Sequence, residues 1–182
     1  DVPYFLFGGP ALGRGRGDEI HPLELELRDR VLLVQGAGGV ETAAVFRRFE
    51  AMGGPGRAAS RIDAFLRASA VDPKGQKTLE LKSLRNDLER AARDESPSLA
   101  AMARRVRRVA RATSATHAVM SGSGSSFFML FDDAAALRRA QGALLGEGVG
   151  CVPCGFLSRR SYLRRFEVKA PARRRRAPSE GR

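Results

Sequence analysis

Short apolar runs separated by helically spaced segments mark the chain from residue 31 onward. Val31–Val34 is a branched-aliphatic run beside a Gly-rich stretch, which predicts a strand buried on both faces. Glycines and prolines over 51–58 predict a loop. Beyond it, apolar residues recur at helical spacing on both sides of a turn at 72–75, so we expect a helix on each side. The repeating positions are Ile62, Phe65 and Leu66, then Leu81, Leu84 and Leu88.

The clearest helix signal begins at Ser96-Pro97, a capping hydroxyl followed by proline in the first turn. The apolar face of this helix is expected to contain Leu99, Met102, Val106 and Val109. Five arginines between 104 and 111 occupy its other faces, where a solvated helix surface is the ordinary explanation.

The rest of the pattern predicts a strand at 117–120, a Gly/Ser loop, and a strand at 126–131. Asp132-Asp133 then starts a helix, because acids favour a helix N-terminus. Closing strands are expected at 151–157 and 161–166. The order of strand, helices, strand, strand, helix and strand predicts an α+β fold of the ferredoxin-like, split βαβ type with a helical insertion.

The composition of 43% hydrophobic residues allows one ordinary domain with its own core, and the net charge of +12 raises the question of nucleic acid. Most arginines lie beside acids, so we do not expect the folded part to bind nucleic acid. The basic tail, 169–182, is expected to be disordered and could make such a contact. The sequence shows neither a signal peptide nor a membrane span, which indicates a cytoplasmic protein.

The segment with the most chemical information is the loop at 121–126, where Gly122 and Gly124 alternate with serines. Glycines let a backbone turn sharply and approach a ligand, and exposed N–H groups and hydroxyls can receive a phosphate. A purely structural hairpin loop explains the spacing equally well.

Met120–Phe128 resembles the C-terminal glycine-rich motif of the GHMP kinases. Further segments resemble one family among them, the 4-diphosphocytidyl-2-C-methyl-D-erythritol kinases. These segments are Asp1–Phe5, Gly8–Ala11 with Gly15–Gly17, Gly39–Thr42 with Phe46, and Arg85–Glu89. The resemblance implies a C-terminal kinase domain at 29–168, preceded by the end of the N-terminal kinase domain at 1–28.

The resemblance implies a role for several residues. Asp1 would be the base that accepts the proton of the attacking hydroxyl, although its local sequence also suits a cap for a helix starting at Pro3. Thr42 would lie near the substrate, and Phe46 would stack on the cytosine ring, although without the resemblance Phe46 would be assigned to core packing. The loop residues Ser121, Gly122, Ser123 and Gly124 would lie near the transferred phosphate.

The activity implied is transfer of the γ-phosphate of ATP, with Mg²⁺ as its metal, to the 2-hydroxyl of 4-diphosphocytidyl-2-C-methyl-D-erythritol in non-mevalonate isoprenoid synthesis. The superfamily's main nucleotide loop does not occur in this sequence, nor does the lysine that the family pairs with the residue corresponding to Asp1. We therefore expect the chain to be inactive alone. Two alternatives stay open: another GHMP small-molecule kinase, and a non-catalytic ferredoxin-like binding module. The sequence does not define an oligomeric state.

Cys151 and Cys154 have a spacing that occurs in metal and redox sites. A structural zinc ion needs further ligands, and neither histidine is suitably spaced from the pair. We therefore predict no metal site and interpret both cysteines as incidental thiols near a strand edge.

Overall fold

The computed structural model describes residues 2–23, 27, 30–36, 38–54, 70–71, 77–78, 81 and 84–166. The chain forms two compact units, one made of Asp1–Leu23 with Leu157–Arg182 and the other of Glu24–Phe156. The predicted division into the end of an N-terminal kinase domain at 1–28, a C-terminal kinase domain at 29–168 and a basic tail at 169–182 stays a prediction.

The larger unit is built on a four-stranded sheet in the order β6-β7-β3-β8. Its strands are β3 (Arg30–Val34), β6 (His117–Met120), β7 (Phe127–Phe131) and β8 (Cys151–Gly155). Every neighbouring pair is antiparallel, with β3 between β7 and β8. This strand order is that of the split βαβ unit, so the predicted ferredoxin-like α+β fold is confirmed.

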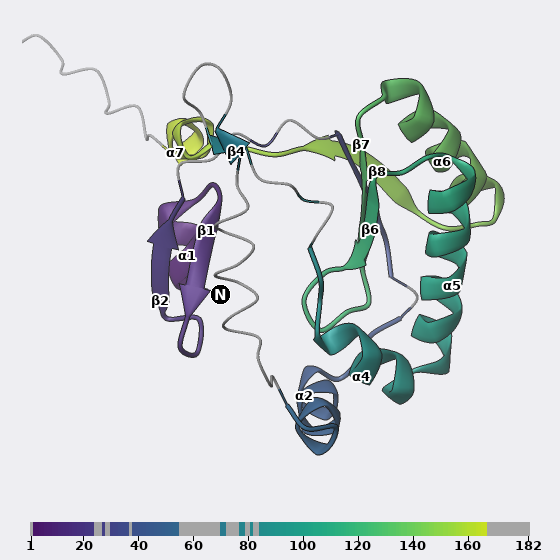
Figure 1. The fold of residues 1–182 in the computed structure, drawn as a ribbon, viewed down its shortest axis with the longest axis horizontal. Helices are drawn as coiled ribbons and strands as arrows, with labels where there is room; N and C mark the ends of the chain where they lie inside the picture. Colours follow the sequence, from purple (N-terminus) through teal and green to yellow (C-terminus); the bar gives the residue numbers. More distant parts are fainter. Residues whose placement is uncertain are drawn as a thin grey trace, which may run out of the picture. The chain divides into compact units, whose positions relative to one another are not determined.

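The helices of this unit are α2 (Thr42–Ala51), α4 (Leu88–Glu95), α5 (Pro97–Ala112) and α6 (Ala134–Gly146). Both α5 and α6 lie on the same side of the sheet (Figure 1). The Ser96 hydroxyl accepts the N–H of Leu99 at 3.2 Å, which caps α5 as predicted. The Asp133 carboxylate caps α6 by accepting two backbone N–H groups, and these bonds lower the pKa of Asp133.

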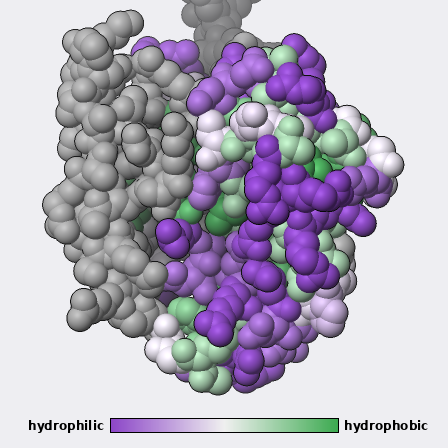
Figure 2. Space-filling model, turned by 45° about the vertical axis from the view of Figure 1, so that its right-hand side comes forward, coloured by the Kyte–Doolittle hydropathy of each residue, from purple (hydrophilic) through white to green (hydrophobic). Residues whose placement is uncertain are grey.

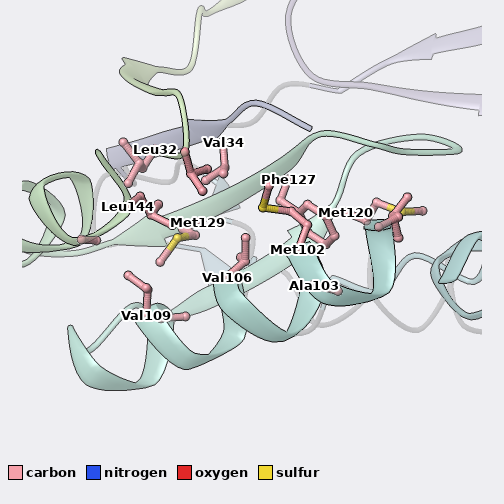
Figure 3. Packing of buried hydrophobic residues seen from close by; sticks show 14 of the residues in the cluster. Leu32, Val34, Met102, Ala103, Val106, Val109, Met120, Phe127, Met129 and Leu144 are labelled. Atoms are coloured by element: carbon pink, nitrogen blue, oxygen red, sulfur yellow. The ribbon is translucent and has the colours of Figure 1, made fainter. Parts of the chain in front are cut away.

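The main core lies between the sheet and α5 and α6. Leu32 and Val34 of β3 and the alternate β7 residues Phe127, Met129 and Phe131 are all buried on the helical side. They pack with the predicted apolar face of α5 and with the apolar face of α6, both of which are buried (Figure 3). The buried helix residues are Leu99, Met102, Val106, Val109, Leu137, Ala140 and Leu144.

The opposite face of β3 is only partly buried. Val31 packs with Leu81 and Leu130, but the Leu33 side chain is 44% exposed. Leu33 pairs with Val152 on the edge strand β8, and that side chain is 61% exposed. The expectation of a strand buried on both faces is therefore wrong at Leu33, because cover is incomplete at this edge.

The smaller unit contains α1 (Val2–Phe7), the hairpin of β1 (Ala11–Arg14) and β2 (Glu19–Pro22), and α7 (Arg159–Phe166). The Tyr162 hydroxyl donates to the Phe5 carbonyl at 2.7 Å, and the Arg159 guanidinium lies 5.5 Å from the Phe7 ring centroid. A Cβ added at Gly9 would lie 2.7 Å from the backbone nitrogen of Arg159, so the lack of a side chain at Gly9 permits the close approach of these two backbone segments.

Two secondary-structure expectations are wrong. Residues 161–166 belong to helix α7 rather than to a strand, because helical spacing lets Arg159 and Tyr162 both contact α1. The helix expected through Leu81, Leu84 and Leu88 begins only at Leu88, because the Asn86 side chain accepts the Leu88 N–H and forms a turn there.

Two short strands were not expected, and three expected features lie where the structure gives no description. The short strands β4 (Ala70–Val71) and β5 (Lys77–Thr78) pair with each other, and the pattern did not predict them. The helix expected at 62–66, the turn at 72–75 and the tail lie outside the described residues.

The core predicts a large difference between two leucine substitutions. Leu99→Ala should lower the free energy of unfolding by about 2–5 kcal/mol, because its side chain is fully buried on α5. Leu145→Ala should change it by only about 0.5 kcal/mol or less, because that side chain is 53% exposed. Urea unfolding followed by circular dichroism measures both. Equal losses would contradict the assignment of α5 to the core.

Candidate functional site

The candidate site is centred on the loop 121–126, which joins β6 to β7. Ser121 N–H donates to the Ser126 carbonyl at 2.9 Å, and Gly124 N–H donates to the Ser121 carbonyl at 3.1 Å. Gly122 and Gly124 have φ angles of 56° and 101°, in the region that favours glycine. The loop is therefore a tight, internally bonded turn.

The loop rests directly on the hydrophobic core. A Cβ added at Gly124 would lie 2.8 Å from Leu99 Cδ1 and 3.1 Å from Met120 Sδ. No side chain fits there without displacing these residues. The same construction at Gly122 meets no atom of the described residues within 4 Å, so none of them covers that side of the loop.

Asn86 joins the loop to α4. Its amide nitrogen donates to the Met120 carbonyl at 2.9 Å and to the Gly122 carbonyl at 2.6 Å. Its amide oxygen accepts the Leu88 N–H at 3.0 Å. Sequence reasoning matched Arg85–Glu89 to a family segment but gave Asn86 no role at the site. An asparagine just before a helix start was the available signal.

Thr42 lies next to the loop, as expected if Thr42 and the loop belong to the same site. Its hydroxyl lies 3.0 Å from the Ser123 hydroxyl, within hydrogen-bond distance. Phe46 follows one turn later on α2, so the two side chains share a helix face. The Phe46 ring is 47% exposed, which is too much for a core residue and leaves a flat apolar surface available.

A second glycine-rich segment contacts the loop from the end of β3. The Ser125 hydroxyl donates to the Gly38 carbonyl. A Cβ added at Gly36 would lie 2.5 Å from the Ser125 carbonyl carbon, so the two backbones approach closely. The loop is thus attached to three separate parts of the described chain: Gly36 and Gly38 after β3, Thr42 at the start of α2, and Asn86 before α4.

These contacts leave hydrogen-bond donors on the loop for a ligand. Within the described part of the chain, the Ser123 N–H has no hydrogen-bond partner. Backbone N–H groups and serine hydroxyls on a glycine-rich turn suit a phosphate oxygen. Asp1 lies outside the described residues, so its predicted position opposite the loop stays a prediction.

Three of the five arginines of α5 are paired with acids. Arg107 pairs with Glu89 on α4, and Arg105 and Arg108 both pair with Glu147 at the end of α6. Hydrophilic side chains cover much of the described surface on this side of the molecule (Figure 2). The pairing offsets part of the positive charge and supports the interpretation of this face as a solvated helix surface.

The cysteines point away from each other. They lie three positions apart on β8, so alternation places them on opposite faces of the sheet. Burial raises the pKa of the Cys151 thiol, which lowers its reactivity. Among the described residues, no group of three or more His, Cys, Asp or Glu could hold a metal ion.

Part of the chain matches a known protein family. Residues 74–149, which include α4, α5, the loop and α6, match the family model described as GHMP kinases C terminal. The chain therefore contains a domain of the GHMP kinase C-terminal family. A crystal structure of homoserine kinase from Cytophaga hutchinsonii has a TM-score of 0.52 at 17% identity, over 86% of this chain and 50% of that one. That likeness is one of fold alone.

Particular relatives share one name, 4-diphosphocytidyl-2-C-methyl-D-erythritol kinase. The protein from Cutibacterium acnes is 38% identical over 145 residues, covering 79% of this chain and 44% of the relative. That from Moorella thermoacetica is 36% identical over 139 residues, covering 76% and 47%. A crystal structure of 4-(cytidine 5'-diphospho)-2C-methyl-D-erythritol kinase gives a TM-score of 0.57 at 30% identity, over 85% of this chain and 53% of that chain.

These comparisons confirm the resemblance that the sequence motifs indicated. The chain spans about half the length of the curated relatives that it matches. Within the described part of the structure, no helix has the length and apolar character needed to cross a bilayer.

The two loop glycines predict unequal effects of adding a methyl group. Gly122→Ala should cost about 1–2 kcal/mol, the cost of placing an L-residue in the left-handed region. Gly124→Ala should cost about 1–3 kcal/mol more, because its Cβ also overlaps Leu99. Thermal and urea unfolding of both variants measure the difference. A Gly124→Ala variant no less stable than Gly122→Ala would show that the loop does not rest on the core.

Proposed function

We propose that the whole protein is an ATP-dependent kinase that phosphorylates the 2-hydroxyl of 4-diphosphocytidyl-2-C-methyl-D-erythritol. The observation that supports this most is the hydrogen-bond contact between Thr42 and Ser123. It brings a predicted substrate residue and the predicted phosphate loop together, although 81 positions separate them. The shared name of the relatives supports the choice of substrate.

In this proposal the loop receives the phosphate that is being transferred. The Ser123 N–H and the hydroxyls of Ser121 and Ser123 would donate to its oxygens, which stabilises charge that spreads over them during transfer. Preformed donors are effective because they need no reorganisation during the reaction.

ATP would supply the phosphate, and Mg²⁺ would be carried mainly by the phosphates of ATP. Magnesium commonly keeps several waters and takes only one or two protein carboxylates, so a cage of protein ligands is not required. The loop supplies donors that fit phosphate oxygens, which is the part of this assignment that the described residues support.

Asp1 would act as the base. A carboxylate within hydrogen-bond reach of the 2-hydroxyl can accept its proton as the oxygen attacks the γ-phosphate in line. This role rests on the resemblance of Asp1–Phe5 to the family signature, and it stays a proposal.

Phe46 and Thr42 would bind the other end of the substrate. The exposed Phe46 ring is available for stacking on cytosine, and Thr42 lies one turn away toward the loop. This arrangement would set the cytidine on α2 and the reacting end of the substrate near Ser123.

The alternatives of another GHMP kinase and of a nucleic-acid-binding module have less support. The homoserine kinase likeness concerns the fold, which many kinases of this class share. Three α5 arginines pair with Glu89 or Glu147, which reduces the free positive charge on that helix. The basic tail, through which nucleic acid would be contacted, lies outside the described residues.

The stacking role predicts the effect of removing the Phe46 ring. Phe46→Ala should weaken binding of 4-diphosphocytidyl-2-C-methyl-D-erythritol by about 5- to 150-fold, since base stacking contributes about 1–3 kcal/mol. Isothermal titration calorimetry measures the change in the dissociation constant. Homoserine is titrated into the unsubstituted protein for comparison. Tighter binding of homoserine than of the cytidine compound would overturn the substrate assignment.

The matched control is Phe156→Ala. Phe156 is also an exposed phenylalanine, at 39%, but it follows the end of β8 that pairs with Arg30, whereas the loop adjoins the other end of the sheet. Its removal should leave binding unchanged. An equal loss in both variants would show that Phe46 acts through general apolar surface and not at a site.

A further inference from the structure

Asn86, just before α4, uses both the nitrogen and the oxygen of its amide in hydrogen bonds. Both hydrogens of its nitrogen are directed to carbonyls at the beginning of the loop, those of Met120 and Gly122. Its oxygen accepts the Leu88 N–H in the first turn of α4. One side chain therefore fixes the loop and the helix start with the same planar group.

The bond to Gly122 has a direct effect on the next residue. In a trans peptide the C=O and N–H groups point in opposite directions. Since Asn86 holds the Gly122 carbonyl toward α4, the Ser123 N–H points away from α4. That N–H has no partner among the residues that the structure describes.

The neighbouring peptide is oriented in the same manner. Asn86 holds the Met120 carbonyl, and the following N–H, that of Ser121, donates across the loop to the Ser126 carbonyl. The two bonds from Asn86 thus set two successive features of the loop: its internal closure and the direction of a free donor.

Glycine can adopt many backbone conformations, so the hydrogen bond from Asn86 helps to fix the conformation at Gly122. Gly122 has φ of 56° and no Cβ, and no atom of the described residues lies within 4 Å of where a Cβ would be, so no described side chain packs on that side of it. Gly124 by contrast is restrained by Leu99 and Met120. The hydrogen bond from Asn86 restrains the Gly122–Ser123 peptide from the α4 side.

We propose that Asn86 is a positioning residue for phosphate recognition: it orients the Gly122–Ser123 peptide so that the Ser123 N–H is presented to a phosphate oxygen. This inference rests on the proposed role of the loop. It adds to that role a residue outside the loop, which acts through the loop backbone and does not itself touch the phosphate.

The test uses two substitutions that keep the helix turn but remove the paired donors. Asn86→Ser is neutral, and its hydroxyl can still accept the Leu88 N–H, but it is too short and has too few hydrogens to hold both carbonyls. Asn86→Asp has the same shape and keeps the acceptor, but its ionised carboxylate cannot donate. Agreement between the two separates loss of the donors from an effect of charge.

The control is Asp133→Ala. It removes the cap of α6 at the end of the sheet away from the loop, so it matches any general loss of stability from a weakened helix start. It touches none of the loop's hydrogen bonds.

The measurements are made on the isotopically labelled chain by nuclear magnetic resonance, with inorganic tripolyphosphate as the probe. In the unsubstituted chain and in Asp133→Ala, the Ser123 amide should shift with the same dissociation constant. In Asn86→Ser and Asn86→Asp, affinity should fall about tenfold or more, the effect of losing one well-placed hydrogen bond. Amide exchange at Ser121 and Gly124 should rise by a similar factor, while α4 beyond its first turn stays protected.

Each other outcome has a distinct meaning. If tripolyphosphate shifts the Ser123 amide equally in the unsubstituted and Asn86 variants, Asn86 is not a positioning residue, although the loop is still a phosphate site. If faster exchange occurs throughout the unit, Asn86 has only a structural role, and the proposal is overturned. If the unsubstituted loop does not respond to tripolyphosphate, the phosphate role of the loop fails and this inference fails with it.

Discussion

The arrangement of the larger unit depends on burial of one face of its sheet against α5. Leu32, Val34, Phe127, Met129 and Phe131 alternate along β3 and β7 and present that face to the helix. Burying side chains of this size stabilises the unit by roughly 1.5–3 kcal/mol each. The same packing fixes the candidate site, because Leu99 of α5 occupies the space next to Gly124 where a side chain would otherwise lie. The position of the glycine-rich loop is therefore a consequence of the core.

Polar contacts then give the loop its conformation. Asn86, Thr42 and the 36–38 segment reach it from three parts of the sequence. Two of these contacts involve serine hydroxyls and one involves backbone carbonyls, so the loop keeps backbone N–H groups for a ligand. The loop packs on the core and keeps hydrogen-bond donors for a ligand. These are the conditions for electrostatic preorganisation, in which donors are held in place before charge develops on the substrate.

Much of the fold could be predicted from the sequence because strong local signals agreed with long-range packing. The Ser96-Pro97 start, the α5 apolar face and the strands around the loop are examples. The 161–166 segment was assigned to the wrong element, because contact with α1 decides its helical state and no local pattern shows that contact. For the site, the resemblance indicated Thr42 and the loop serines, but Asn86 was missed. Its role depends on two carbonyls 34 and 36 positions away, which spacing along the chain cannot reveal.

The loop and the start of α2 are proposed to form one site, in which the loop receives the phosphate transferred from ATP and Thr42 lies beside it on the substrate side. The most direct measurement is paramagnetic broadening of backbone amide signals by ATP with Mn²⁺ in place of Mg²⁺, since broadening reports proximity to the metal on the phosphates. The account predicts selective broadening at Ser123 and Thr42, with the amides near Asp133 and Phe156 unaffected. Broadening centred on the arginines of α5, with the loop unchanged, would contradict it.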